Sequence, residues 1–451
     1  MSQTTKRVFT RKSKLFLILV GMILVLSCSS PLGDEGTGGG GGSGGGTQVI
    51  DGKEFPSWYL TAEQQEKHFS MGPTILFASS KNPVRHYRIP AIIVADNGNI
   101  IAFGDNRYNH GSDIGTPGKV IDVVYRVSKD GGKNWSTEKI IQPKSPSANM
   151  TGIDNKGDAL VFKAKSGNLI CMAVSGGGYA SAGNPATPSR MVRSVSTDNG
   201  ETWSNWEEVG KSLFDTMQVK YNRKQGFATS GRGLTLANGD LSAAMSVNNG
   251  SGQIVILYIY STDEGKTWQA GGEIPASTIG VINEPKPIAE LDNGNILMSV
   301  RNASSKAGQQ GKARMYSISK DKGINWDPLK AWNEMKCGNI DAEGIVWTRN
   351  GIEDKTRILH IQVGPTYRNG LRLWLSVNQG QSWESKLQIL QDNHRAGYSS
   401  LDVCGDGTVV TFAEEASEKG QYYDLVFRRY NMKAITQEVY KTEWYKEIKT
   451  K

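Results

Sequence analysis

Cysteine is scarce in this chain of 451 residues, and the few thiols lie far apart. The four cysteines are Cys28, Cys171, Cys337 and Cys404, and the five histidines show no metal-ligand spacing. A disulfide framework or a structural zinc site needs several such residues at short, regular spacings. The sequence therefore predicts neither a disulfide scaffold nor a metal site, and the last three cysteines are expected to be buried, unpaired thiols.

Helical periodicity is missing as well. No long stretch repeats its apolar residues at helical spacing, and the apolar fraction is only 37%. Glycine, with 53 residues, and tryptophan, with 11, are both abundant. This composition favours many short strands joined by tight turns, so the predicted fold class is all-β.

The N-terminus has the features of a targeting segment. Five basic residues precede an apolar run of 12 residues at positions 15–26, which is too short to span a bilayer comfortably. The run ends in Val25-Leu26-Ser27-Cys28, which resembles a bacterial lipobox. We expect residues 1–27 to be a lipoprotein signal peptide and Cys28 to be acylated, with a plain signal peptide or short membrane anchor as the alternative. The mature chain would then lie in the cell envelope, attached to a membrane only through its lipid.

The positive charge of the chain comes largely from this leader. The formal net charge is +8, and residues 1–27 carry five basic and no acidic residues. The basic balance therefore does not indicate a nucleic-acid partner. Residues 28–48 are rich in glycine and are predicted to form a flexible tether. Residues 49–451 are predicted to be the folded domain.

Two internal repeats run through that domain. The first is an eight-residue Ser-x-Asp-x-Gly-x-x-Trp turn, the Asp box, which begins at Ser128, Ser196, Ser261 and Ser319; a fifth copy at Ser376 has Asn378 in place of the aspartate. The aspartate is expected to accept backbone N–H groups within the turn, and the glycine to supply a positive φ. This repeat predicts the fold and carries little information on chemistry.

The second repeat is a β-hairpin that recurs six times. Its turns lie at Asn97-Gly98, Ser166-Gly167, Asn238-Gly239, Asn293-Gly294, Asn350-Gly351 and Asp406-Gly407. Asn-Gly and Asp-Gly between apolar alternations are strong hairpin signals. Six units of about 63 residues are long enough for four-stranded blades. The sequence therefore predicts a six-bladed β-propeller, closed by pairing of residues 74–78 with a last strand near 423–430.

Polar residues flank these hairpins at the end opposite the turns. In a propeller those ends converge on one face, which would gather Arg88, Arg107, Asp113, Asp158, Glu284, Arg301, Arg368, Tyr398 and Glu414. From about residue 73 to about residue 430 the chain resembles the bacterial retaining exo-α-sialidases. The resemblance rests on Tyr87-Arg88-Ile89-Pro90, Asn283-Glu284, Arg301-Asn302, Arg368-Asn369, Gly397-Tyr398-Ser399-Ser400-Leu401 and Phe412-Ala413-Glu414, in the family's order and interleaved with Asp boxes.

The resemblance implies how the substrate is held. Sialic acid carries a carboxylate on its anomeric carbon, and guanidinium groups bind a carboxylate in a fixed fork geometry. The three candidates for this contact are Arg88, Arg301 and Arg368. Glu414 is expected to pair with Arg88, with Glu415 beside it as the alternative.

The resemblance also implies the catalytic groups. A carboxylate nucleophile would be repelled by the substrate's own charge, whereas a neutral tyrosine would not, provided a base lowers its effective pKa. Tyr398 is the predicted nucleophile and Glu284 its base. Asp113 is the predicted general acid and base, a task that calls for a raised pKa, with Asp105 and Asp122 as competitors.

Arg107 and Asp158 are expected to contact substituents of the sugar ring. The predicted reaction is hydrolysis of terminal sialic acid from glycoconjugates with retention, by a monomer that needs no cofactor. Two alternatives stay open at the level of sequence: a non-catalytic propeller that binds sialylated glycans, and a trans-sialidase, including an intramolecular one. Cleavage of a related 2-keto sugar acid is a third.

Overall fold

The computed structural model describes residues 46–441, apart from 51, 82–83, 143–154, 180–186, 223, 252, 275–276, 305, 307–309 and 418–421. The predicted signal peptide, the acylation site Cys28 and nearly all of the predicted tether lie outside the described residues and stay predictions. Within the described part of the chain, no helix has both the length and the apolar character needed to cross a membrane.

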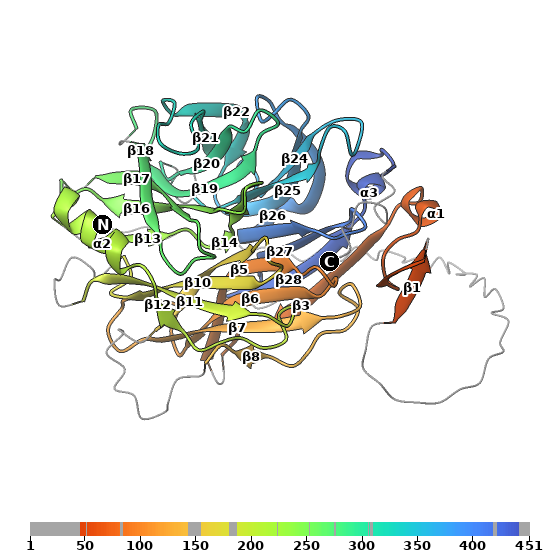
Figure 1. The fold of residues 1–451 in the computed structure, drawn as a ribbon, viewed down its shortest axis with the longest axis horizontal. Helices are drawn as coiled ribbons and strands as arrows, with labels where there is room; N and C mark the ends of the chain where they lie inside the picture. Colours follow the sequence, from red (N-terminus) through yellow and green to blue (C-terminus); the bar gives the residue numbers. More distant parts are fainter. Residues whose placement is uncertain are drawn as a thin grey trace, which may run out of the picture. The chain divides into compact units, whose positions relative to one another are not determined.

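The described residues form an all-β, propeller-like arrangement in which successive stretches of chain build successive sheets (Figure 1). One sheet contains β4 (Ser80–Lys81), β5 (Val84–Val94), β6 (Ile100–Tyr108), β7 (Val120–Ser128) and β8 (Lys139–Ile140). The next contains β9 (Gly157–Lys163), β10 (Leu169–Gly176), β11 (Ser189–Ser196), β12 (Glu207–Glu208) and β14 (Gly231–Arg232). Its strands pair antiparallel, except that β14 pairs parallel with β9.

Two further antiparallel sheets follow. The first contains β13 (Gly226–Ala228), β15 (Leu234–Thr235), β16 (Leu241–Asn248), β17 (Ile254–Ser261) and β18 (Gln269–Ile274). The second contains β19 (Ile282–Glu290), β20 (Ile296–Asn302), β21 (Lys312–Ser319) and β22 (Lys330–Cys337).

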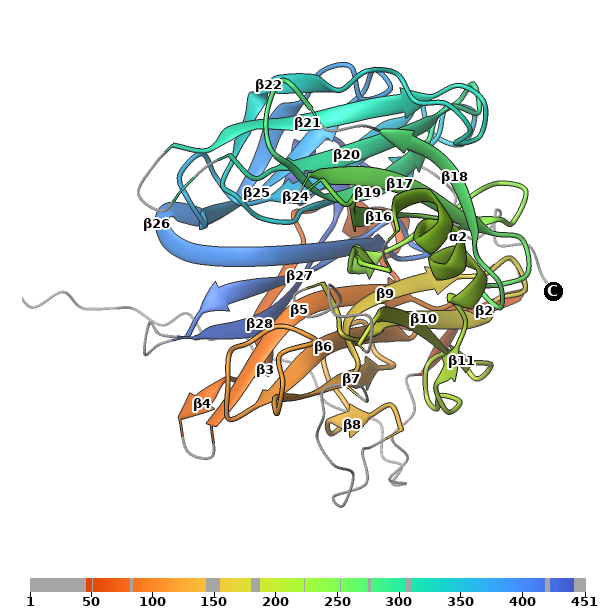
Figure 2. The same ribbon diagram turned by 90° about the vertical axis from the view of Figure 1, so that its left-hand side faces the viewer.

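The last large sheet has seven strands. These are β23 (Glu343–Thr348), β24 (Arg357–Gln362), β25 (Asn369–Ser376), β26 (Glu384–Val403), β27 (Val409–Ala416), β28 (Tyr423–Tyr430) and β3 (Ser70–Phe77). The 20-residue strand β26 pairs with β25 through its first part and with β27 through its second (Figure 2). The pairing of β28 with β3, in which Leu425 lies opposite Phe77, confirms the predicted closing contact between the two ends of the domain.

The local predictions from the two repeats are confirmed. All six hairpins form, as the antiparallel pairs β5–β6, β9–β10, β15–β16, β19–β20, β23–β24 and β26–β27. In the first Asp box, the Asp130 carboxylate accepts the Asn134 N–H at 2.9 Å, and Gly132 has a φ of +96°. In the fifth box, Asn378 accepts the Ser382 N–H at 3.0 Å and so replaces the aspartate.

The remaining elements are short. They are β1 (Thr47–Ile50), β2 (Lys53–Pro56), α1 (Ala62–Gln65), α2 (Lys211–Tyr221) and α3 (Met432–Thr436). Between β2 and α1, Trp58 stacks on the Arg429 guanidinium, which pairs with the buried Asp406 at 2.8 Å. The thiols of Cys171, Cys337 and Cys404 are buried and free, as predicted.

Candidate active site

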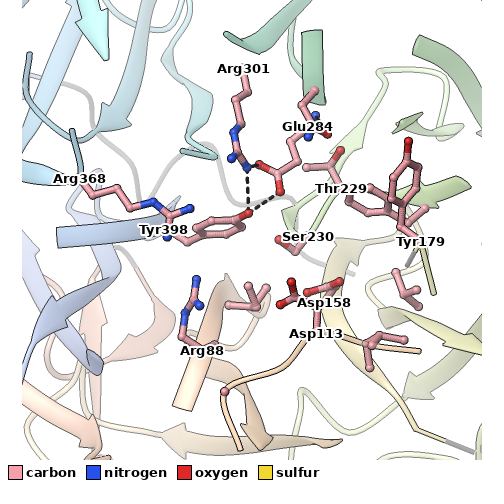
Figure 3. A pocket seen from close by; sticks show the side chains of 16 residues that line it. Arg88, Asp113, Asp158, Tyr179, Thr229, Ser230, Glu284, Arg301, Arg368 and Tyr398 are labelled. Carbon is pink, nitrogen blue, oxygen red and sulfur yellow. Dashed lines mark hydrogen bonds and ion pairs between the residues drawn. The ribbon is translucent and has the colours of Figure 1, made fainter. Parts of the chain in front are cut away.

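Seven of the nine predicted site residues line one cavity of about 390 Å³ (Figure 3). They are Arg88, Asp113, Asp158, Glu284, Arg301, Arg368 and Tyr398. The other two, Arg107 and Glu414, lie behind this lining and contact it through hydrogen bonds. Residues that are up to 310 positions apart in the sequence therefore meet at one cavity, as predicted for residues that flank the hairpins at the end opposite the turns.

Several cavity residues are held in a backbone conformation that is rare for residues other than glycine. The φ angle is +57° at Ile89, +55° at Asp158, +32° at Glu284 and +51° at Arg368. The strand register shifts beside two of them, between Arg88 and Ala91 and between Asn283 and Pro285. Such bulges bend a strand and re-aim its side chains. Each positive φ costs on the order of 1–3 kcal/mol and is typical of functional sites.

Glu414 joins two parts of the site from behind. Its carboxylate accepts the Arg88 Nε–H at 2.5 Å and the Ile89 N–H at 2.9 Å, and its other oxygen accepts the Tyr398 N–H at 3.1 Å. Burial opposes the charge on Arg88, but Glu414 outweighs burial and raises the pKa of the guanidinium. The alternative partner, Glu415, is instead paired with Arg428. The predicted pairing of Arg88 with Glu414 is therefore the one observed.

This arrangement makes Gly397 a sensitive position. A Cβ at Gly397 would lie 2.1 Å from Glu414 Oε2, so Gly397→Ala must displace the carboxylate that holds Arg88 and Tyr398. We expect kcat/KM on a sialoside to fall about tenfold or more, since at least one charge-assisted hydrogen bond is lost. Gly46→Ala is a matched control, because its Cβ would approach no atom closer than 3.4 Å. Full activity in Gly397→Ala would show that Glu414 does not fix these groups.

Tyr398, Glu284 and Arg301 form one hydrogen-bonded set at the cavity (Figure 3). The Tyr398 hydroxyl donates a short hydrogen bond to Glu284, and Arg301 Nη1 donates to both the Tyr398 oxygen, at 3.1 Å, and the Glu284 carboxylate. Arg301 Nε donates to Asn339 Oδ1 at 2.7 Å, which fixes the plane of the guanidinium. The phenol oxygen is thus held between a carboxylate and a cation.

Tyr398 is held in its neutral form, which is the form the sequence predicts for the nucleophile. Burial, and next the negative charge of Glu284, raise the pKa of the phenol well above its usual value, although Arg301 opposes them. A carboxylate that accepts the phenol proton in a hydrogen bond stabilises the neutral form. The phenol is therefore neutral at rest, and any help from Glu284 as a base must come during attack, which stays a prediction.

Of the three arginines that line the cavity, Arg368 has a buried N–H group without a hydrogen-bond acceptor among the described residues. This group is Nε, and the guanidinium lies 5.6 Å from the centre of the Tyr367 ring. A buried, unpaired donor is costly unless a ligand satisfies it. The cavity therefore offers an anion three guanidinium groups, one of which lacks an acceptor of its own.

Asp113 lies on the opposite side of the cavity from Glu284 (Figure 3). Its side chain is 80% exposed, and Arg107 Nη1 donates to its carboxylate at 2.7 Å. Partial desolvation opposes ionisation of Asp113, but Arg107, followed by Arg88 and Arg368, outweighs it and lowers the pKa. This is the opposite of the raised pKa expected for a general acid. The competitors Asp105 and Asp122 are buried and do not line the cavity.

Comparison with known proteins identifies the family. A family model described as a BNR repeat-like domain matches residues 111–411. The sialidase of Micromonospora viridifaciens is 25% identical over 338 residues, which make up 72% of this chain and 49% of that protein. The chain belongs to the bacterial sialidase family with BNR repeats.

Solved structures of other members of the family share its fold. Hadza microbial sialidase Hz136 superposes with a TM-score of 0.66 at 20% identity, covering 81% of this chain and 69% of that chain. The intramolecular trans-sialidase from Ruminococcus gnavus superposes with a TM-score of 0.63 at 16% identity, covering 81% and 98%. The chain spans 49%, 64% and 66% of the length of three curated sialidases that it matches, and smaller shares of others.

In this member of the family, Arg107 is enclosed by two carboxylates. Its side chain is 1% exposed and bridges Asp105, at 3.1 Å, and Asp113, at 2.7 Å. Arg107 lies directly behind Asp113, and its expected contact with a sugar substituent stays a prediction. Asp158 does line the cavity, and burial together with Asp105 raises its pKa well above the usual value.

The sequence reading missed one wall of the cavity. This wall contains Ile114, Val174, Tyr179, Phe227, Thr229 and Ser230. Tyr179 and Phe227 pack edge to face with ring centres 5.5 Å apart. Thr229 and Ser230 precede the third hairpin, so the rule that found Tyr398 before the sixth hairpin also points to them. Asn339 carried no such signal, because it lies in the connection from β22 to β23 and acts through Arg301.

Proposed function

We propose that this chain is an exo-α-sialidase that hydrolyses terminal sialic acid from glycoconjugates with retention of configuration. The observation that carries the proposal is the hydrogen-bonded set of Tyr398, Glu284 and Arg301 beside two further guanidinium groups in one cavity. A phenol held against a base suits attack on a carbon that bears a carboxylate, and the three arginines suit that carboxylate. A propeller that only binds glycans has no need of the phenol and its base.

The substrate carboxylate would lie between Arg88, Arg301 and Arg368. Each charge-assisted hydrogen bond contributes roughly 1.5–3 kcal/mol. Glu414 accepts a hydrogen bond from Arg88 Nε, and Asn339 accepts one from Arg301 Nε. These contacts hold the two guanidinium groups in place and leave Nη atoms to face the ligand. Pre-orientation of this kind reduces the entropy lost on binding.

The first chemical step would use Tyr398 as the nucleophile. A bond forms between Tyr398 Oη and the anomeric carbon while the bond to the leaving oxygen breaks, and the phenol proton passes to Glu284. Because the phenol is neutral at rest, no free phenolate repels the incoming carboxylate, and general-base help arises only during attack. Asp113 donates its proton to the leaving oxygen in the same step.

The second step would release the sugar. Asp113 removes a proton from water, the water oxygen attacks the anomeric carbon, and the bond to Tyr398 breaks as Glu284 returns its proton to the phenol oxygen. Two displacements at one carbon give net retention. The pKa of Asp113 is lowered partly by Arg88 and Arg368, and a bound carboxylate would neutralise both cations and so raise that pKa towards what an acid needs.

Substitution of Arg368 by lysine tests the carboxylate site. Lysine keeps the charge but loses the planar fork, so we expect Arg368→Lys to raise the Kd of an unsaturated sialic acid analogue about tenfold or more, a loss of at least about 1.5 kcal/mol. Isothermal titration calorimetry measures this directly. Arg372→Lys is the control, since Arg372 lies on β25, the strand that begins directly after Arg368, but pairs with Asp392 outside the cavity. Unchanged affinity in Arg368→Lys would remove Arg368 from the site.

We also propose six blades for the architecture. The seven-stranded sheet divides at β26 into two four-stranded units, because the first part of β26 pairs with β25 and the second with β27. With the four other large sheets this makes six units, one for each predicted hairpin. Attachment to the cell envelope through Cys28 and a monomeric state belong to the same proposal.

Trans-sialylation is the second candidate function. The fold is shared with an intramolecular trans-sialidase, so the fold does not separate transfer from hydrolysis. The experiment is turnover of an aryl α-sialoside followed by proton NMR. Early appearance of the α-anomer of free sialic acid is the expected result. An anhydro sugar would favour intramolecular transfer, the β-anomer formed first would exclude retention, and no turnover with retained binding would favour a glycan-binding protein.

A further inference from the structure

The loop that carries Asp113 is short and held by few side chains. It leaves β6 at Asn109, where φ is +59°, and reaches Asp113 within four residues. Arg107 Nη1 donates to Gly111 O at 3.3 Å as well as to the Asp113 carboxylate. The Asp113 side chain itself is mostly exposed, so its position depends on the backbone beneath it.

His110 provides further contacts that shape this loop, beside the hydrogen bond that the Thr116 hydroxyl donates to the Asp113 carbonyl at 2.9 Å. The residue is only 7% exposed, and both of its ring nitrogens are used. Nδ1 lies 3.1 Å from the Ser112 backbone nitrogen, and Nε2 lies 2.8 Å from Val120 O at the start of β7. The Ser112 N–H can only donate, so Nδ1 must accept, and the carbonyl of Val120 can only accept, so Nε2 must carry the proton. The geometry thus selects one tautomer of the neutral imidazole.

We propose that His110 is a positioning residue for Asp113, which it holds over the leaving group by accepting the Ser112 N–H and donating to the Val120 carbonyl. This inference rests on the proposed sialidase function and goes beyond it by assigning the residue that positions the general acid, Asp113. His110 does not line the cavity and touches no substrate. Its effect should therefore appear in the two steps that use Asp113, and in kcat/KM only through the donation of the Asp113 proton to the leaving group.

Protonation of His110 would break this arrangement. A second ring proton on Nδ1 would point at the Ser112 N–H, and the acceptor would be lost. The charged and titratable groups that face the ring also oppose a second charge: Arg107 from β6, Lys119 from the segment before β7, and His86 from β5. Burial first, and then Arg107 and Lys119, lower the pKa of His110. Positioning is therefore complete above pH 6.5 and is lost as the pH falls through that lowered value.

The test compares leaving groups. A nitrophenyl sialoside departs as a weakly basic phenolate and needs little acid assistance, whereas sialyllactose departs as an alkoxide and needs Asp113. In the full chain, we expect His110→Ala to lower kcat/KM for sialyllactose about tenfold or more and to leave the nitrophenyl substrate within about threefold. In His110→Asn, the Oδ1 atom can accept the Ser112 N–H, so this variant should recover much of the lost kcat/KM for sialyllactose. Its kcat/KM should also lack the fall at low pH that protonation of His110 causes. His394→Asn, at an exposed position, is the matched control.

A double-mutant cycle with Asp113→Asn completes the test. If His110 acts through Asp113, His110→Ala should cause no further loss in the Asp113→Asn background. Equal losses on both substrates, or fully additive losses in the cycle, would overturn the proposal and leave His110 as a stabilising residue only. An unchanged Kd for the unsaturated analogue shows that the cavity of each variant is folded. If the unaltered chain cleaves neither substrate while it binds the analogue, the proposed function fails first and this inference falls with it.

Discussion

Tyr398→Phe is expected to lose activity on the order of 10³-fold or more in kcat while the fold survives. Only a hydroxyl is removed, and the ring can keep its place beside the Arg88 guanidinium, whose carbon lies 5.6 Å from the ring centre. Without the oxygen there is no atom to form the covalent intermediate. Initial rates on an aryl α-sialoside, with thermal unfolding as a check on the fold, give the measurement.

The matched control is Tyr423→Phe. Tyr423 also lies under Arg88, with its ring centre 5.2 Å from the guanidinium carbon, but its hydroxyl accepts a hydrogen bond from Arg395 and does not contact Glu284. Removal of that hydroxyl should leave kcat within a few-fold of the unaltered chain. Comparable activity of Tyr398→Phe and Tyr423→Phe would contradict the nucleophile assignment.

Glu284→Gln should give the second largest effect, a fall in kcat of about 10²–10⁴-fold. The amide oxygen of glutamine can still accept the Tyr398 hydrogen bond, so the substitution removes basicity with little change in shape. It also deprives the buried Arg301 guanidinium of its carboxylate partner. Affinity for the unsaturated analogue should change much less than kcat, because the arginines that hold the carboxylate remain.

Glu290→Gln serves as the control for this substitution. Glu290 lies at the other end of β19, where its carboxylate accepts the Ala237 N–H. The two variants therefore change the same chemical group on the same strand, one in the cavity and one far from it along the chain. If Glu284→Gln kept more than a tenth of the original kcat, another group would have to be the base.

The all-β, propeller-like arrangement and most of the residues that line the cavity could be predicted because they depend on local signals. An Asp-box turn and an Asn-Gly hairpin are each specified within about eight residues, and six such units in series determine where strand ends converge. Tyr398 and Arg301 were therefore placed on this face by their positions beside a hairpin, while their predicted roles came from the family resemblance. The same rule, applied to the third hairpin, would have found Thr229 and Ser230.

The remaining features arise from contacts between distant strands. The positive φ at Glu284 follows from a bulge between β19 and β20, which no motif in the sequence marks. Arg107 was assigned to the substrate through the family resemblance, and the sequence did not show that Asp105 and Asp113 would both pair with it. The lowered pKa of Asp113 depends on arginines from three separate strands or loops. Each contribution depends on the distance between the charges, which the sequence does not give.

Trapping of the intermediate tests the central claim most directly. A sialosyl fluoride with a second fluorine beside the anomeric carbon forms the covalent adduct readily, since fluoride needs no acid, but releases it slowly. After reaction with the full chain and tryptic digestion, mass spectrometry should place one sugar on Tyr398, and Tyr398→Phe should remain unlabelled. A sugar attached to any other residue, or steady release of fluoride without an adduct, would contradict a mechanism through Tyr398.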